Sequence, residues 1–551
     1  MMEKVKRSIF SENLNHFSPD DFSEEEKMIK STVKQFVENK VYPQLPEMEA
    51  HNYDVIRSLF KESGELGLLG ADVSEEYGGI NMGKKTSGLI AEEMGHGSSF
   101  GVSFNIHTGV GVSPYIYFGT EEQKQNYLSK LTSGEGIGAY ALTEPNAGSD
   151  ALASKTNAKE KDGGYVLNGE KQWITNAHVA AVYLVFAKTA EGITAFIVDR
   201  DLDGVSIGQE ESKLGIQGSS TATLILEDVY LDKNKVLGEV GKGHYIALNI
   251  LNLARLKLAF SNLGAGKQAL NTTIKYGIER KQFGKSITEF PMIKEKIANM
   301  VIDIYESESS IYYTGSLLDE LNITSDNIYQ QLPDYAMDCA LNKIAASEML
   351  DYVVDEGLQV HGGYGFMKDY DIERMYRDAR INRIFEGTNE INRLTVTRSF
   401  LKVLKNNPDL LTEEDQVTEM YYTKAKGVLN LIMRALSESE EIKLAEIENE
   451  QELMRLLADI IKDVYTLRTV ILRDGKNNNE IQKYIENAIS EEKLRKVRNN
   501  GGAILSRLFS NAEHIEYVNE LKDMSTFQRI DIIELKRKIA DHFIKKGEYI
   551  L

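Results

Sequence analysis

A change of hydrophobic period along the chain is the feature that most limits what this sequence can fold into. From Tyr140 to about Gly238, apolar residues come in short runs or alternate with polar ones, as in Val182-Tyr-Leu-Val-Phe-Ala and Ile193-Thr-Ala-Phe-Ile-Val. This pattern is typical of β-strands. Two turn signals, Asp162-Gly163-Gly164 and Asn168-Gly169, predict hairpins. The segment is therefore predicted to form a compact all-β unit.

On both sides of this unit, apolar residues recur at helical spacing. Ser23 and Glu26 fit a capping box in front of such a stripe, and helical spacing resumes near Tyr245. Pro408 marks a boundary, because proline disfavours helix at the residue before it. The predicted fold class is α+β with four domains: N-terminal helical (1–139), middle β-barrel or sandwich (140–244), helical bundle (245–405) and additional C-terminal helical (406–551).

The C-terminal segment contains one long apolar stripe at helical spacing. Its members are Leu453, Leu456, Leu457, Ile460, Ile461, Val464 and Leu467. Such a stripe either packs in a core or faces a membrane, and we favour the core. Because no apolar run in the sequence is long enough to span a bilayer, membrane association has no support here.

Length and charge exclude some classes of protein. With 551 residues the chain is too long for one ordinary core. Its 84 acidic residues outnumber 64 basic ones, giving a formal net charge of −20. That field repels phosphate backbones, so nucleic-acid binding is excluded, although local cations can still hold an anionic coenzyme. The single cysteine, Cys339, excludes intrachain disulfides and multi-cysteine zinc sites, and we predict no metal site.

The N-terminus carries basic residues but lacks the apolar centre of a signal peptide, and acidic residues follow from Asp20 onwards. We therefore expect a cytoplasmic, bacterial protein. A mitochondrial location would require a targeting peptide that has already been removed.

Four segments combine polar and aromatic residues in ways that suit chemistry. The loop from Tyr140 to Asp150 offers hydroxyls and backbone donors, and Trp173 is a tryptophan that would stack on a planar cofactor. In the segment 280–284 a guanidinium suited to phosphate lies beside an aromatic ring. In the fourth segment, which runs from 359 to 365 and on from 383 to 390, Glu386 is flanked by Phe385 and Gly387, where desolvation would raise its pKa towards that of a base. Each segment alone also fits an ordinary turn, core residue or surface charge.

Together, and in this order, the four segments resemble the acyl-CoA dehydrogenase family over residues 20–400. The loop Thr143-Glu-Pro-Asn-Ala-Gly-Ser-Asp and the segment Phe385-Glu-Gly-Thr-Asn-Glu carry the resemblance. The additional C-terminal domain resembles the very-long-chain branch, as do Phe366-Met-Lys-Asp and Glu373-Arg-Met-Tyr-Arg-Asp-Ala-Arg. The resemblance implies an FAD-dependent oxidoreductase of fatty acid β-oxidation.

The resemblance also implies which residues contact FAD, some of them from a neighbouring subunit. The contacts expected within one subunit are Tyr140, Leu142, Thr143, Gly148, Ser149, Trp173, Ile174, Thr175, and, at a helix start facing the pyrophosphate, Thr388, Asn389 and Glu390. The contacts expected from the neighbour are Arg280, Gln282, Phe283, Gln359, Val360, Gly362 and Gly363.

By the same resemblance, Glu386 is the catalytic base. In the family, the backbone N–H of this glutamate and a ribityl hydroxyl of FAD bind the thioester carbonyl and stabilise enolate-like charge. The base takes the α-proton while a β-hydride passes to the flavin, giving a trans-2-enoyl-CoA. Some relatives place the base immediately before the arginine that matches Arg255. Here that residue is Ala254, which cannot act as a base.

For the acyl-CoA substrate, the resemblance implies contacts with Ser149, Asn252, Arg255, Gly387 and Gly111. A structural ion pair is the alternative for Arg255. Gly111 matches a small residue that lengthens the acyl tunnel in the very-long-chain branch, but Pro114 replaces another. A long-chain substrate is therefore a hypothesis. Phe290-Pro291 also departs from medium-chain members, which affects one expected flavin contact between subunits.

The implied partners are electron transfer flavoprotein as electron acceptor and a second copy of the chain in a homodimer. Two alternatives use the same fold: an acyl-CoA oxidase, which passes electrons to oxygen, and a non-catalytic scaffold or assembly protein. Because the base and the flavin loop are both intact, we favour the dehydrogenase.

Overall fold

The computed structural model describes residues 18–551 except 414, 416, 441, 475–478, 510–513 and 525–529. The N-terminal helices are α1 (Glu24–Phe36), α2 (Leu45–Glu49), α3 (Tyr53–Glu65), α4 (Lys84–Gly95), α5 (Ser99–Ile106), α6 (Ser113–Phe118) and α7 (Glu121–Ser133). The predicted capping box of α1 is confirmed. Ser23 Oγ accepts from the Glu26 N–H at 3.2 Å, and Glu26 Oε2 accepts from the Ser23 N–H at 2.9 Å.

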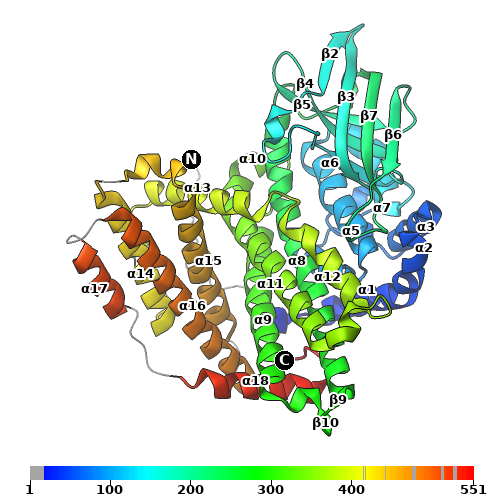
Figure 1. Cartoon of the computed structure of the whole chain (residues 1–551). Helices are drawn as coiled ribbons and strands as arrows, with labels where there is room; N and C mark the ends of the chain where they lie inside the picture. Colours follow the sequence, from blue (N-terminus) through cyan, green and yellow to red (C-terminus); the bar gives the residue numbers. More distant parts are fainter. Residues whose placement is uncertain are drawn as a thin grey trace.

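The described residues between Gly138 and Leu237 form the predicted β unit. Its strands are β1 (Gly138–Ala141), β2 (Asn157–Lys161), β3 (Gly164–Thr175), β4 (Val182–Lys188), β5 (Ile193–Asp199), β6 (Val205–Glu210), β7 (Thr221–Asp232) and β8 (Val236–Leu237). They form one sheet in the order β6-β7-β3-β2-β4-β5-β8, with β1 parallel to β4. Figure 1 shows this sheet beside the N-terminal helices at one end of the molecule.

One of the two predicted hairpin turns is wrong. The turn at 162–164 does join β2 to β3. Asn168-Gly169, in contrast, lies inside β3, where the register shifts at a β-bulge. A Cβ on Gly169 would lie 2.5 Å from Thr156 Oγ1. The glycine thus permits a close approach of two chain segments and does not reverse the chain.

The bundle that follows the sheet is built around one very long helix. Its helices are α8 (Gly243–Glu279), α9 (Pro291–Glu320), α10 (Ile328–Gln331), α11 (Ala336–His361), α12 (Asp371–Ala379) and α13 (Asn389–Asn406), with a hairpin of β9 (Lys281–Gln282) and β10 (Lys285–Ser286). Helix α8 starts against β5, because an added Cβ on Gly243 would lie 2.9 Å from the Ala195 nitrogen. It spans about 55 Å at 1.5 Å per residue, and the hairpin lies at its far end (Figure 1).

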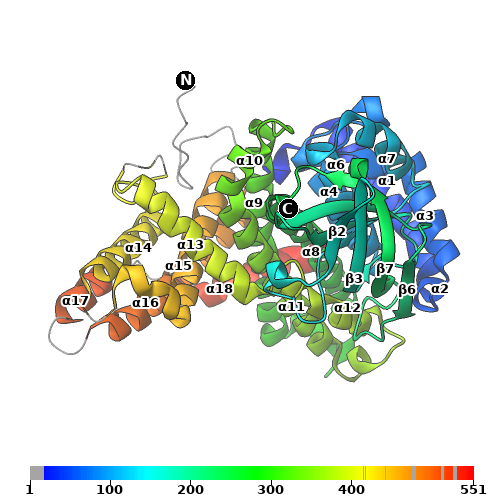
Figure 2. The ribbon, with the colours of Figure 1, turned by 90° about the horizontal axis from the view of Figure 1, so that it is seen from above.

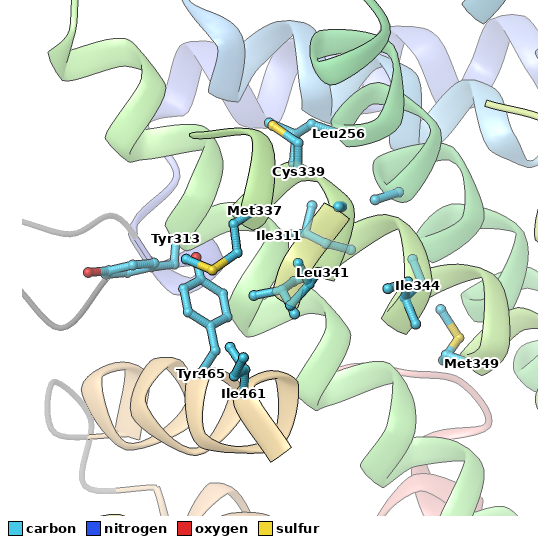
Figure 3. Packing of buried hydrophobic residues seen from close by; sticks show 14 of the residues in the cluster. Leu256, Ile311, Tyr313, Met337, Cys339, Leu341, Ile344, Met349, Ile461 and Tyr465 are labelled. Carbon is cyan, nitrogen blue, oxygen red and sulfur yellow. The ribbon is translucent and has the colours of Figure 1, made fainter. Parts of the chain in front are cut away.

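The additional C-terminal helices pack on the bundle. They are α14 (Met420–Glu438), α15 (Gln451–Asp474), α16 (Glu480–Leu508), α17 (His514–Met524) and α18 (Ile532–Lys546). Viewed from above, α14 to α17 lie on the opposite side of α9 and α11 from the sheet (Figure 2). Figure 3 shows Ile461 and Tyr465 of α15 close to Tyr313, Met337 and Leu341 of the bundle.

The predicted apolar stripe of α15 is core, as we favoured. The buried members are Leu453, Leu457, Ile460, Ile461, Val464 and Leu467, and they belong to the same cluster as the bundle residues. In the part of the chain that the structure describes, no helix combines the length and the apolar character needed to cross a bilayer.

Buried charges also tie the C-terminal helices to the rest of the molecule. Arg473 of α15 donates to Glu308 of α9 at 2.8 Å and pairs with Asp20 of the N-terminal segment at 3.2 Å. The Tyr549 hydroxyl donates to the same Glu308 carboxylate at 3.0 Å. Removing one partner would leave a buried charge uncompensated, so this contact resists separation of the domains.

Candidate active site

Glu386 lies on a strained turn between a 3-10 segment (Arg380–Arg383) and α13. Its φ is +56°, and that of Gly387 is +84°. The left-handed region is uncommon for a glutamate and costs about 1–3 kcal/mol, so it persists only where surrounding contacts enforce it. One such contact comes from α8, where Arg255 Nε donates to the Glu386 carbonyl at 3.0 Å.

Two of the residues predicted to bind CoA are thus part of this support. Arg255 is buried and also donates to the Asn252 side chain at 2.9 Å. The structure therefore places Arg255 against the backbone of Glu386 and Asn252 against Arg255. Their contact with CoA stays a prediction.

Lys343 of α11 is a second support, which sequence reasoning missed. Its Nζ donates to the Gly387 carbonyl at 2.9 Å and to Asn389 Oδ1 at 2.7 Å. The same carbonyl accepts from Asn392 Nδ2 at 2.7 Å. Lysines are almost never fully buried unless they are paired. A cation in the apolar helix stretch 339–346 was the signal that could have identified it.

The Glu386 side chain sits where solvent is excluded from one of its oxygens. The residue as a whole is half-buried, but Oε2 is shielded and has no hydrogen-bond partner among the described residues. Burial raises the pKa of Glu386 to about 7, against the opposing effects of Arg255 and Lys343. Burial also lowers the pKa of Lys343 to about 7, against the attraction of Glu386. A carboxylate with a pKa near neutrality is suited to general-base catalysis.

A cavity opens directly beside this carboxylate. Its lining comes from α5 and the segment that follows it, from α8, from the 3-10 segment Arg380–Arg383 and from the turn. It comprises Val102, Asn105, Ile106, Val110, Ala254, Lys257, Leu258, Ser261, Asn382, Phe385 and Glu386. Gly111, predicted to line the acyl tunnel, does not contribute to this lining. An added Cβ on Gly111 would lie 2.9 Å from the Gly138 carbonyl oxygen, so this glycine permits close packing of the segment on β1.

Several residues predicted to contact the flavin ring gather where β1 and β3 end. The Gln172 N–H donates to the Thr143 carbonyl at 2.9 Å, and Lys171 Nζ donates to the Leu142 carbonyl at 3.2 Å. These bonds place the loop after β1 next to Trp173. Burial, together with Glu386, raises the pKa of Tyr140 well above its usual value, which connects the same loop to the base.

The end of β3 has a shape that fits a planar cofactor. Trp173 follows a break in strand register, has a φ of +58° and is 57% exposed, whereas the adjacent Ile174 is buried. Thr175 is half-buried, and Gly148 and Ser149 are exposed. An added Cβ on Gly148 would meet open space among the described residues, so a ligand can approach its backbone. The exposed indole of Trp173 offers a surface on which a flavin ring can stack.

The start of α13 offers backbone donors beside the base. Thr388 caps the helix by accepting from the Ile391 N–H at 3.3 Å, and Glu390 is exposed. The Asn389 side chain, in contrast, is buried and bonded to protein groups. Any contact of Asn389 with the pyrophosphate is thus left to its backbone N–H.

The other predicted FAD residues form a second group far from the first. The Arg280 guanidinium lies 5.2 Å from the centre of the Tyr364 ring, and the Tyr276 hydroxyl donates to the His361 carbonyl at 3.1 Å. These contacts bring the segment with Gln282 and Phe283 next to the segment with Gln359, Val360, Gly362 and Gly363. Phe283 is 94% exposed at the hairpin. Along α8, Arg280 lies about 37 Å from Arg255, which is longer than one FAD molecule.

Comparison with known proteins identifies the family. Residues 23–135, 139–229 and 241–401 match the N-terminal, middle and C-terminal domains of acyl-CoA dehydrogenases, respectively. A probable acyl-CoA dehydrogenase of Bacillus subtilis (strain 168) is 45% identical over 84% of this chain and 82% of its own. Mitochondrial isovaleryl-CoA dehydrogenase of Solanum tuberosum is 37% identical over 69% of this chain and 92% of its own.

A solved structure resembles nearly the whole chain. Acyl-CoA dehydrogenase of Bacillus anthracis, complexed with FAD, aligns with a TM-score of 0.93 and 40% identity, over 99% of this chain and 98% of that one. The chain belongs to the acyl-CoA dehydrogenase family. It is an FAD-dependent oxidoreductase acting on a CH–CH bond, and its C-terminal helices extend beyond the three family domains.

Replacing Lys343 tests its influence on the base. Because the lysine lowers the pKa of Glu386, Lys343→Met should raise that pKa above about 7. If Glu386 is the base, it is active when deprotonated, so the acid limb of the pH–rate profile should move to higher pH. The rate below that limb should fall by up to about tenfold for each pH unit of movement. The measurement is anaerobic flavin reduction by an acyl-CoA across the neutral range.

Lys343→Arg is the matched control, since it keeps a positive charge throughout the neutral range and the limb should not move to higher pH. If the pH–rate profile of Lys343→Met overlays that of the wild type, Lys343 does not lower the pKa of the group that limits the rate.

Proposed function

We propose that this protein dehydrogenates a saturated fatty acyl-CoA to the trans-2-enoyl-CoA, as the first step of fatty acid β-oxidation, and passes the electrons to electron transfer flavoprotein. The observation that carries the proposal is Glu386, a carboxylate with a pKa of about 7 whose Oε2 faces no protein donor among the described residues. A structural carboxylate in such a place would be paired. One that must accept a proton from a ligand is left free.

The residues of the chain divide the chemistry between them. Glu386 takes the α-proton of the thioester substrate in the cavity that it lines. Arg255 and Lys343 hold the carbonyl groups of residues 386 and 387 and so fix the turn, whose N–H groups would face the thioester oxygen. A bound FAD would supply the acceptor for the hydride that leaves the β-carbon. Trp173 and the loop from Tyr140 to Ser149 would hold its ring and exclude water.

The surroundings of the Glu386 cavity support a long acyl chain. Val102, Ser261 and Asn382 line both this cavity and a neighbouring one, which also contains Leu350, Val354 and Met375. The neighbouring cavity measures about 60 Å³, against about 30 Å³ beside the base. The room for further carbon atoms therefore lies past Ser261, in a cavity whose lining also includes the polar side chains of Gln268, Arg374 and Asp378.

The opposite direction is less favourable for an acyl chain. Lys257 lines the Glu386 cavity on that side and lies 3.4 Å from Asp72, which is also paired with Lys84. Behind this pair the cavity measures only about 10 Å³. Buried charges would have to move before a methylene chain could pass, which is costly.

The separation of the two groups of FAD residues supports a homodimer. If each FAD takes its ring contacts from one subunit, the segments around Arg280 and Gly362 can reach its other half only from a second copy. Exposed Phe283 and the open glycine backbone at 362–363 are suited to such a contact. The cytoplasmic location stays a prediction.

The alternatives are less well supported. A scaffold protein would have no need of a strained glutamate held by two buried cations. An acyl-CoA oxidase shares this geometry and differs in how the reduced flavin is reoxidised, so comparing oxygen with electron transfer flavoprotein as acceptor separates the two enzymes.

Anaerobic titration of the purified yellow protein with acyl-CoAs tests the proposed reaction. Wild-type protein should be bleached. Glu386→Gln should bind the same ligands yet be reduced about 10² to 10⁴ times more slowly, the usual contribution of a general base. Wild-type flavin that no acyl-CoA bleaches, or Glu386→Gln protein bleached at the wild-type rate, would contradict the proposal.

The same titration ranks substrates by chain length. Palmitoyl-CoA should reduce the flavin more efficiently than octanoyl- or butyryl-CoA, because the cavity beside Glu386 shares Val102, Ser261 and Asn382 with a second cavity into which a longer chain can extend. A preference for butyryl-CoA would overturn the long-chain hypothesis while leaving the reaction itself intact.

Subunit complementation tests the shared FAD site. Glu386→Gln and Arg280→Glu chains, co-expressed with different tags, should form hybrids in which one site carries both changes and the other carries neither. Activity should approach half of the wild-type value, although each parent dimer is inactive. Hybrids as inactive as the parents, or a chain that sediments as a monomer, would rule out sharing.

A further inference from the structure

The catalytic turn is connected to the C-terminal helices by an unbroken chain of charged and polar contacts. Lys343 Nζ bonds to the Gly387 carbonyl and to Asn389 Oδ1. The amide nitrogen of Asn389 then donates to Glu348 Oε1 at 3.1 Å and to Ser347 Oγ at 3.1 Å. Both side-chain atoms of Asn389 are thus used, and they fix the residue that immediately follows the turn at the start of α13.

Glu348 is in turn held by an arginine from α13. Arg393 donates to it in bidentate fashion, Nη1 to Oε1 at 2.8 Å and Nη2 to Oε2 at 3.1 Å. Fork-shaped pairs of this kind fix orientation as well as distance. Burial acts to raise the pKa of Glu348, but the Arg393 contact outweighs it and the pKa is lowered. Glu348 is therefore ionised at neutral pH.

The last contact crosses into the C-terminal domain. Arg393 Nε donates to Asp459 Oδ1 of α15 at 2.8 Å, and both side chains are mostly shielded from solvent. The guanidinium is therefore clamped between a carboxylate of the bundle and a carboxylate of the added domain. Next to it, Thr397 Oγ1 donates to the Met454 carbonyl of α15 at 2.8 Å.

We propose that the C-terminal domain positions the catalytic turn, and that Asp459 is the positioning residue through which it does so. Asp459 fixes Arg393, Arg393 fixes Glu348, and Glu348 fixes Asn389 and with it the turn that carries Glu386. This inference rests on the proposed function of Glu386. It gives the added domain a role in catalysis that its distance from the cavity would not suggest, since small displacements of a catalytic group cost rate steeply.

A second ion pair between α13 and the C-terminal domain provides a matched control. Arg398 Nε pairs with Glu448 at 3.1 Å, with both side chains more than half exposed. Glu448 belongs to the 3-10 segment Leu444–Asn449. Within the described part of the chain, neither residue forms a hydrogen bond or ion pair with the residues that lead to the turn. Asp459→Ala and Glu448→Ala thus each remove one carboxylate from the same interface. Only the carboxylate of Asp459 is connected through hydrogen bonds to the turn that carries Glu386.

The experiment compares these variants as FAD-loaded, full-length proteins. Asp459→Ala should lower the limiting rate of flavin reduction about tenfold or more with little change in acyl-CoA affinity, whereas Glu448→Ala should match the wild type. Asp459→Asn, which keeps an acceptor oxygen for Arg393 Nε, should recover part of the rate. If Asp459 contributed only to stability, its variants would differ in melting temperature, but the limiting rate of flavin reduction would not differ between Asp459→Asn and Asp459→Ala.

Hydrogen–deuterium exchange of the segment 384–392 gives a readout that needs no substrate. Amides of this segment should exchange faster in Asp459→Ala than in Glu448→Ala or the wild type. Equal exchange in the two alanine variants, or equal flavin-reduction rates, would overturn the positioning role. If no acyl-CoA reduces the wild-type flavin, the proposed function fails, and the exchange result still decides whether Asp459 orders the turn.

Discussion

The left-handed turn at Glu386 and Gly387 is the feature on which the site depends. Its φ values of +56° and +84° are unfavourable for a glutamate and acceptable for a glycine. Peptide groups in this conformation need hydrogen-bond partners, and here the partners are buried cations from two different helices. Arg255 and Lys343 therefore both hold the backbone of this short turn. The long helices α8 and α11 carry these two side chains and fix their positions.

The same arrangement sets the electrostatics of the base. A lone carboxylate in this position would be protonated at neutral pH because burial disfavours its charge. Two cations nearby oppose that effect, and the pKa of Glu386 remains at about 7. Because the cations bond to backbone oxygens and not to the carboxylate, Oε2 stays open to a substrate proton. Arg255 and Lys343 thus both hold the backbone of the turn and limit the rise in the pKa of Glu386.

Much of this architecture could be predicted from the sequence, because it depends on local patterns. Strand and helix periodicity predicted the order of domains, the Ser23–Glu26 cap and the core position of the stripe in α15. The hairpin turn predicted at Asn168-Gly169 was wrong because this dipeptide suits both a turn and a β-bulge. The close approach of Thr156, which is distant from any local pattern, decides in favour of the bulge. Gly111 packs against Gly138, which is distant in sequence, and its role in an acyl tunnel stays a prediction.

The supports of the turn were harder to predict from the sequence. Lys343, Glu348, Arg393 and Asp459 come from three helices, and their roles depend on contacts between residues far apart along the chain. A lysine in an apolar helix indicates that the side chain has a buried partner, but the sequence does not show which residue that partner is. Glu386 itself was identified only by resemblance, because a lone glutamate beside a glycine has no distinctive pattern.

Exchange of the α-proton of a substrate that cannot lose a hydride tests the central claim most directly. With 3,3-dimethylbutyryl-CoA, which has no hydrogen on the β-carbon, FAD-loaded protein in D₂O can only remove and return the α-proton. Mass spectrometry should show deuterium entering at a rate that rises with pH through about 7 and is lost in Glu386→Gln. Exchange that persists in Glu386→Gln, or that is independent of pH, would contradict the assignment of Glu386 as the base.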